Sequence, residues 1–126
     1  MKRKRILIVD DDPEINQTLK KRLEYNGFSC PSAASVEMAL QKIEKGDFDL
    51  VVLDLGFPGV DGTAFLKNVE QHLSPKQKIP PILVLSCYND KEVVEHVLQS
   101  GAVAFMAKPY DSAELLSTIR CLTQAP

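Results

Sequence analysis

The chain has 126 residues, of which 44% are hydrophobic and 25% charged, and a formal net charge of −2. This composition indicates one globular domain, 1–126, and the weak negative charge argues against a nucleic-acid-binding domain held by positive charge. No apolar run approaches the roughly 20 residues that a membrane span needs, and the run at 6–9 is too short for a signal peptide. The three widely spaced cysteines favour free thiols in a reducing compartment, so we expect a cytoplasmic protein.

The N-terminal third of the chain predicts a strand, a helix and a second strand. The apolar run at 6–9 precedes a helix that Asp12 caps and that ends at Gly27. Residues 28–32 indicate a short, weak strand, and Pro31 within it is typical of a sheet edge because proline has no amide donor.

The middle of the chain continues the alternation. A helix is predicted from the cap at Ser35 to the stop at Gly46, followed by the clearest strand at 50–53. Apolar residues at helical spacing then predict a third helix over 65–73, and a loop with three prolines follows at 74–81.

The C-terminal part predicts two further strand–helix units. The fourth strand lies at 82–85 and its helix runs from the cap at Asp90 to Gly101; the fifth strand is predicted at 103–107. A last helix over 111–122 begins at a possible capping box, and Cys121 on it is expected in the core rather than as a redox sensor.

Five strand–helix units with continuous apolar strands predict an α/β fold. Strands that are apolar throughout are buried on both faces, as in a doubly wound parallel sheet with helices on both sides. Five units favour the flavodoxin-like strand order 2-1-3-4-5 over the Rossmann order, and ligands then bind where the order reverses, between the first and third strands.

Polar residues of the kind that phosphoryl chemistry requires follow four of the five strands. Asp10 and Asp11 end the first strand, Asp54 the third, Ser86 the fourth and Lys108 the fifth. Three carboxylates in one crevice raise one another's pKa or require a cation, and an all-oxygen cluster suits Mg²⁺. With a hydroxyl and an ammonium group beside them, they form a site for a phosphoryl group, and one carboxylate can be the nucleophile.

Each of these residues alone has an ordinary structural explanation. The three aspartates at 10–12 are typical of a solvated helix start, Asp54 of a turn, and Lys108 of a surface loop. Their combination at the strand ends of one predicted sheet favours the functional interpretation.

With this pattern, the chain resembles a response-regulator receiver domain of two-component signalling. The resemblance covers nearly its whole length. The segments that carry the resemblance are ILIVDDDP at 6–13, VVLDLGFPGVDG at 51–62, ILVLS at 82–86 and AFMAKPY at 104–110. The resemblance implies a phosphorelay switch that catalyses only its own phosphorylation and dephosphorylation, not an enzyme acting on a separate metabolite.

The resemblance also implies roles for individual residues. Asp54 matches the phosphoacceptor, which attacks a phosphohistidine of a sensor histidine kinase or phosphotransfer protein. Asp11 matches a direct Mg²⁺ ligand, Asp10 a ligand acting through water, and Gly56 a ligand through its backbone carbonyl.

Further matches concern the switch. Ser86 matches the hydroxyl that binds a phosphoryl oxygen, and Phe105 the aromatic residue that moves with it. Lys108 matches the lysine that binds another phosphoryl oxygen, and its bond to Pro109 is expected to be cis. In the family the signal passes to the surface of the fourth helix, fifth strand and fifth helix, which would control an output domain or a target protein, or form a homodimer. Neither direct nucleic-acid contact nor a membrane partner is expected.

Two departures from the family pattern lie after the fourth strand. Cys87 stands where a small alanine or glycine is usual, and Tyr88 is placed to cover the phosphoryl site and slow hydrolysis. The predicted last helix ends near Leu122, so the protein is expected either to stand alone or to be a fragment of a longer regulator.

Three other functions fit the sequence less well. A haloacid-dehalogenase-like phosphatase needs a second aspartate at position 56, which is Gly56. A phosphate-independent module with the same fold predicts an incomplete acidic site, whereas the site in this sequence is intact. The glycine motifs of P-loop and dinucleotide-binding proteins do not occur after the first strand.

Overall fold

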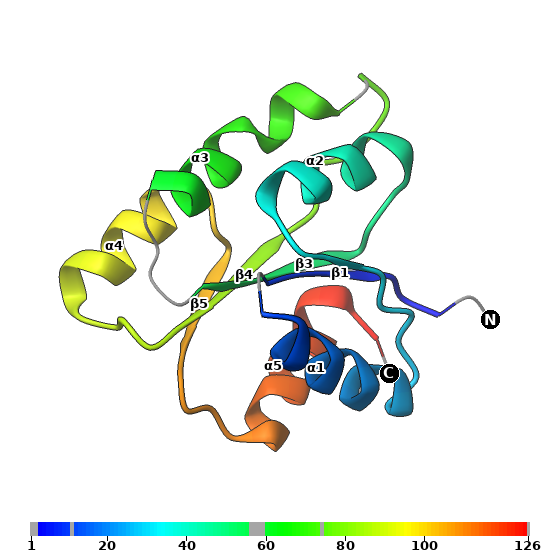
Figure 1. The fold of residues 1–126 in the computed structure, drawn as a ribbon, viewed down its shortest axis with the longest axis vertical. Coiled ribbons are helices and arrows are strands. Elements are labelled where there is room, and N and C mark those ends of the chain that lie inside the picture. Colours follow the sequence, from blue (N-terminus) through cyan, green and yellow to red (C-terminus); the bar gives the residue numbers. More distant parts are fainter. Residues whose placement is uncertain (1–2, 11, 56–59, 74, 126) are drawn as a thin grey trace.

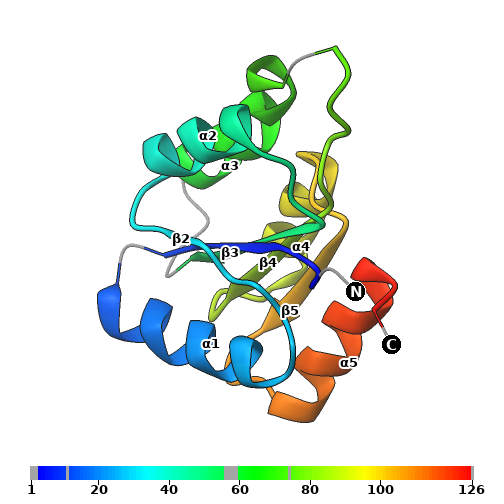
Figure 2. The same ribbon diagram turned by 90° about the vertical axis from the view of Figure 1, so that its right-hand side faces the viewer.

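A five-stranded parallel sheet lies between two layers of helices in the computed structural model, which describes residues 3–10, 12–55, 60–73 and 75–125 (Figures 1 and 2). The strands are β1 (Ile6–Val9), β2 (Ser32–Ala33), β3 (Leu50–Leu55), β4 (Ile82–Ser86) and β5 (Ala104–Ala107). The helices are α1 (Pro13–Tyr25), α2 (Val36–Lys45), α3 (Val60–Asn68) with the 3₁₀ turn η1 (Val69–His72), α4 (Lys91–Gln99) and α5 (Ser112–Thr123). The strand order is β2-β1-β3-β4-β5, so the predicted flavodoxin-like order is confirmed.

The sheet divides the core into two clusters of buried side chains. Val51 and Leu53 of β3 belong to the cluster that α2, α3 and α4 cover, whereas Leu50 and Val52 belong to the cluster that α1 and α5 cover. Figure 1 shows the same division, with α1 and α5 on one side of the sheet and the other helices opposite. Alternate side chains of each central strand therefore point into different apolar layers, which explains why the strands are apolar throughout.

Capping residues set the start of three helices at the predicted positions. Asp12, Ser35 and Asp111 stand immediately before α1, α2 and α5, and each side chain accepts a hydrogen bond from an amide of the first turn. These bonds satisfy backbone donors that the helix itself leaves without a partner. Asp90 also precedes α4, although its side chain makes no capping hydrogen bond.

The second strand differs from its prediction. Regular pairing with β1 covers only Ser32–Ala33, and Ser29 makes an isolated bridge to Arg5. Pro31 accepts a hydrogen bond from Ile8 but has no amide to donate, so it interrupts regular pairing within the predicted strand at 28–32. Its predicted position at the sheet edge is confirmed.

The cysteines lie in different environments. The prediction that Cys121 belongs to the core is wrong: it is exposed, because the buried stripe of α5 runs through Leu115 and Ile119, and Cys121 lies about half a turn beyond Ile119. Cys30, in contrast, is buried in the cluster beneath α1 and α5, and burial raises the pKa of its thiol to about 12. Cys30 therefore packs as an apolar residue.

Candidate functional site

Two buried carboxylates lie at the carboxyl ends of the neighbouring strands β1 and β3. Val9 pairs with Leu53 in the parallel register, so Asp10 and Asp54 follow at the same level. Both residues are buried, with 5% and 3% of their surface exposed. The predicted reversal of strand order between the first and third strands thus brings these two acidic residues to one edge of the sheet.

Lys108 compensates the charge of Asp54. Its ammonium group forms an ion pair with Asp54 Oδ1, and the side chains are only 18% and 1% exposed. The Lys108 amide donates to the carbonyl of Ser86 at 2.9 Å, which extends the pairing of β4 and β5. This bond fixes the backbone from which the lysine side chain extends. A buried carboxylate is costly without such a partner. The peptide bond from Lys108 to Pro109 is cis, as predicted.

Ser86 brings a hydroxyl group to the same edge. It is fully buried at the end of β4, and it pairs with Leu55, the residue after Asp54. Its Oγ accepts a hydrogen bond from the Tyr88 amide at 3.0 Å. A hydroxyl group can act as both donor and acceptor, and donation is what recognition of a phosphoryl oxygen requires.

Phe105 lies on β5 beside the fourth strand. It pairs with Val84 and is partly buried, and its side chain packs against the cluster covered by α2, α3 and α4. The predicted switch residues Ser86 and Phe105 are therefore on adjacent strands, two register steps apart.

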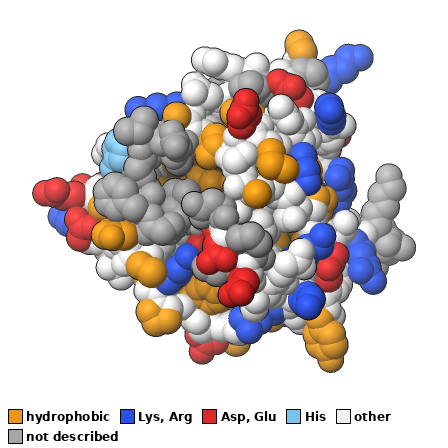
Figure 3. Space-filling model, viewed as in Figure 1, with side chains coloured by type: hydrophobic (Ala, Val, Ile, Leu, Met, Phe, Trp, Pro, Cys, Tyr) orange, Lys and Arg blue, Asp and Glu red, His pale blue; other side chains and the backbone are white. Residues whose placement is uncertain are grey.

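The donor set of the described site fits a hard cation. Asp10 Oδ1 accepts a hydrogen bond from the Asp12 amide at 2.8 Å, which orients its carboxylate. Figure 3 shows acidic side chains gathered near the middle of the displayed face. Oxygen ligands from two buried carboxylates suit Mg²⁺. The other two predicted metal ligands, Asp11 and Gly56, lie outside the described residues.

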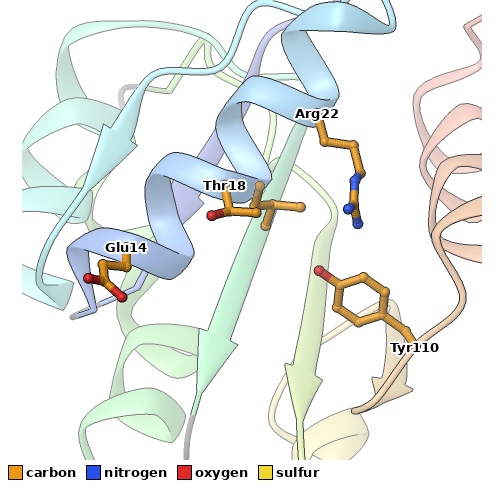
Figure 4. A pocket seen from close by; sticks show the side chains of 5 residues that line it. Glu14, Thr18, Arg22 and Tyr110 are labelled. Carbon is orange, nitrogen blue, oxygen red and sulfur yellow. The ribbon is translucent and has the colours of Figure 1, made fainter.

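Tyr110 extends the site toward α1. It lines an open pocket of about 310 Å³ with Glu14, Thr18, Leu19 and Arg22, and Figure 4 shows its hydroxyl pointing toward the Arg22 guanidinium. Burial, and secondarily the negative charge of Asp54, raise the pKa of Tyr110 above its ordinary value. Tyr110 ends the segment AFMAKPY but was assigned no role from the sequence, because its proximity to Asp54 arises only when β3 and β5 enter the same sheet.

Known proteins are similar to this chain in sequence and in fold. Residues 6–120 match the family model of the response regulator receiver domain. The chain is 36% identical over 118 residues to the transcriptional regulatory protein BasR of Escherichia coli, covering 94% of this chain and 51% of BasR. It therefore spans about half the length of that relative. No helix within the described ranges is long and apolar enough to cross a membrane.

Solved structures agree with the sequence comparison. A putative response regulator from Chloroflexus aurantiacus superimposes with a TM-score of 0.84 and 34% identity, covering 98% of this chain and 99% of that one. The beryllofluoride-activated receiver domain dimer of NtrC4 superimposes with a TM-score of 0.80 and 28% identity, covering 95% and 96% of the two chains.

The charge of Asp54 should be measurable at Tyr110. We predict that Asp54→Asn lowers the pKa of Tyr110, because it removes a negative charge that opposes formation of the tyrosinate. The folded-state pKa of Tyr110 is raised, so its contribution to stability is complete below its ordinary pKa of 10.0 and is lost as the pH rises through the folded value. Tyrosinate absorbance during alkaline titration measures the shift. Tyr110→Phe assigns the signal, and an unchanged Tyr110 titration in Asp54→Asn contradicts the prediction.

Proposed function

Because this chain belongs to the response-regulator receiver family, we propose that it accepts a phosphoryl group on Asp54 from a sensor histidine kinase or phosphotransfer protein. We place the whole chain, 1–126, in this one cytoplasmic receiver domain. The observation that carries the proposal is the buried Asp54 carboxylate, which is paired with Lys108 and lies beside Asp10 in the strand register. The resulting module is a switch, and it catalyses only its own phosphorylation and dephosphorylation.

The transfer forms one bond and breaks another. An oxygen of Asp54 attacks the phosphorus of the donor phosphohistidine, the new P–O bond forms, and the P–N bond to the imidazole breaks with its electrons returning to the nitrogen. The protein contributes position and charge, which are what phosphoryl transfer chiefly needs. Lys108, already directed at Asp54, balances negative charge on a phosphoryl oxygen, and the Ser86 hydroxyl donates to another.

Asp10, Asp11, Asp54 and the backbone carbonyl of Gly56 would hold Mg²⁺ in this site. The bound ion supplies charge neutralisation for the transferred group. Phosphorylation adds roughly two negative charges, and it does so beside the buried carboxylate of Asp10. Asp10 and Lys108 must then act together, one binding the cation and the other contributing positive charge of its own.

The same residues connect the site to a surface of the molecule. A phosphoryl group on Asp54 draws the Ser86 hydroxyl toward it, and Phe105 turns into the space that this movement leaves. Ser86 lies on β4 and Phe105 on β5, and these two strands pair directly. The change biases two packing arrangements of α4, β5 and α5, and this surface controls an output domain, a target protein or a second copy of the chain.

The phosphoacceptor assignment is tested with a small phosphodonor. We expect acetyl phosphate with Mg²⁺ to add one phosphoryl group to the wild-type chain, as a base-labile adduct detected by intact-protein mass spectrometry. Asp54→Asn keeps the side-chain shape but removes the nucleophilic oxygen, and it should abolish the adduct. Chelation of Mg²⁺ should abolish it as well.

Asp90→Asn provides the matched control for this experiment. Asp90 is an exposed aspartate just before α4 whose side chain makes no capping hydrogen bond, so its variant should be phosphorylated like the wild type. An adduct that persists in Asp54→Asn, or one that forms equally well without Mg²⁺, contradicts the proposal.

Tyr88 is expected to protect the phosphorylated state. Its amide donates to Ser86 Oγ, which places its backbone beside the buried hydroxyl group, and half of its surface is exposed. We predict that Tyr88→Ala accelerates loss of the phosphoryl group after the donor is removed, because water reaches the phosphorus more easily. Tyr88→Phe retains the ring and should behave like the wild type. An unchanged dephosphorylation rate in Tyr88→Ala contradicts this role.

A further inference from the structure

A buried asparagine on α1 joins the ends of two strands. Asn16 is 7% exposed, and its Nδ2 donates to the carbonyl oxygens of Asp10 at 3.2 Å and of Ala33 at 3.3 Å. The Asp10 amide itself donates to the carbonyl of Ala33 at 3.1 Å. Asn16 thus completes a small network that links α1, the end of β1 and the end of β2.

The chemistry of the two acceptors fixes the orientation of this amide. Both partners of Asn16 are carbonyl oxygens, which only accept, so the NH₂ end of the side chain must face them. Reversing the amide would place its own oxygen against two others. The network therefore depends on the two protons of one nitrogen.

The network restrains Asp10 on both sides of its side chain. Its amide is held by Ala33 and its carbonyl by Asn16, while its carboxylate accepts from the Asp12 amide at 2.8 Å. Like charges on adjacent strands repel one another, and Asp54 lies in β3 at the same level as Asp10. A restrained backbone keeps the Asp10 carboxylate at this edge despite that repulsion.

Stability alone is a weak explanation of Asn16. Within the described ranges, its Oδ1 is buried without a hydrogen-bond partner. A buried polar atom left without a partner costs more free energy than a single hydrogen bond contributes in net terms. The gain from the two bonds of Nδ2 is therefore largely offset, and what remains specific to the asparagine is where it holds the Asp10 carbonyl.

We propose that Asn16 is a positioning residue that holds Asp10 in the orientation needed to bind Mg²⁺. This role rests on the proposed function, since it concerns the same metal site. Asn16 acts through the backbone of Asp10 and touches neither the cation nor the phosphoryl group.

Thr123 offers a matched control. It is a buried polar residue like Asn16, 5% exposed, and its hydroxyl donates to the Ile119 carbonyl within α5 at 2.8 Å. Asn16→Leu and Thr123→Val each replace a buried hydrogen-bonding side chain with an apolar one of similar size. Both remove buried hydrogen bonds, but only the first should disturb Asp10.

Two measurements distinguish positioning from stability. Calorimetric titration with Mg²⁺ should show roughly 10-fold weaker binding in Asn16→Leu, the size typical of removing a group that orients a metal ligand, and wild-type affinity in Thr123→Val. In the metal-free protein, the NMR signal of the Asp12 amide, which donates to Asp10 Oδ1, should shift only in Asn16→Leu. Unchanged Mg²⁺ affinity and an unmoved Asp12 signal in Asn16→Leu would overturn the proposal.

The wild-type chain gives the remaining controls. If it binds no Mg²⁺, the proposed function fails, and the metal-free Asp12 signal alone decides whether Asn16 positions Asp10. If Asn16→Leu does not fold, scalar couplings across the hydrogen bonds from Asn16 Nδ2 to the Asp10 and Ala33 carbonyls, together with the response of the Asn16 side-chain signals to Mg²⁺, test the role directly. Measurable couplings and a response to Mg²⁺ support it; couplings that are missing, or Asn16 signals that ignore Mg²⁺, refute it.

Discussion

Burial of two carboxylates at one end of a sheet is the constraint on which the rest of this structure depends. Asp10 follows β1 and Asp54 lies near the end of the adjacent strand β3, and both are almost completely buried. Charges in such a place are tolerated only with compensating positive charge and hydrogen bonds. Lys108 supplies that compensation in the described structure, and in the proposed function Mg²⁺ and the phosphoryl group add to the same balance. The site therefore responds to added charge, because its own charged groups are already buried close together.

The topology connects the site to α4 and α5 in the proposed function. Asp10 follows β1 and Asp54 lies in β3, whereas Ser86 ends β4 and Lys108 follows its neighbour β5. In the proposed function, a change at Asp54 is therefore transmitted through the two strands that precede α4 and α5. In that function, the acidic residues bind the cation and accept the phosphoryl group. The Ser86 hydroxyl and Lys108 contact the phosphoryl group and respond to its presence.

Much of this arrangement could be predicted from the sequence, because it follows from local patterns. Continuous apolar runs gave the buried strands, caps gave three helix starts, and the strand order placed the residues after each run at one edge. Features that local sequence patterns do not encode were missed or predicted wrongly. Asn16 and Tyr110 matter through tertiary contacts with Asp10 and Asp54, Pro31 shortened the second strand to two residues, and Cys121 lies outside the buried stripe of its helix.

The most direct test of the account is binding of beryllofluoride, which stands in for the phosphoryl group, followed by ¹⁹F and backbone-amide NMR. The account predicts bound ¹⁹F signals only when Mg²⁺ is present and Asp54 is intact, with amide shifts at Ser86, Tyr88 and Lys108 that spread into α4 and α5. A phosphate-independent module would bind nothing under these conditions. An absence of bound signals from the folded wild-type chain with Mg²⁺, or binding that survives Asp54→Asn, would contradict the central claim.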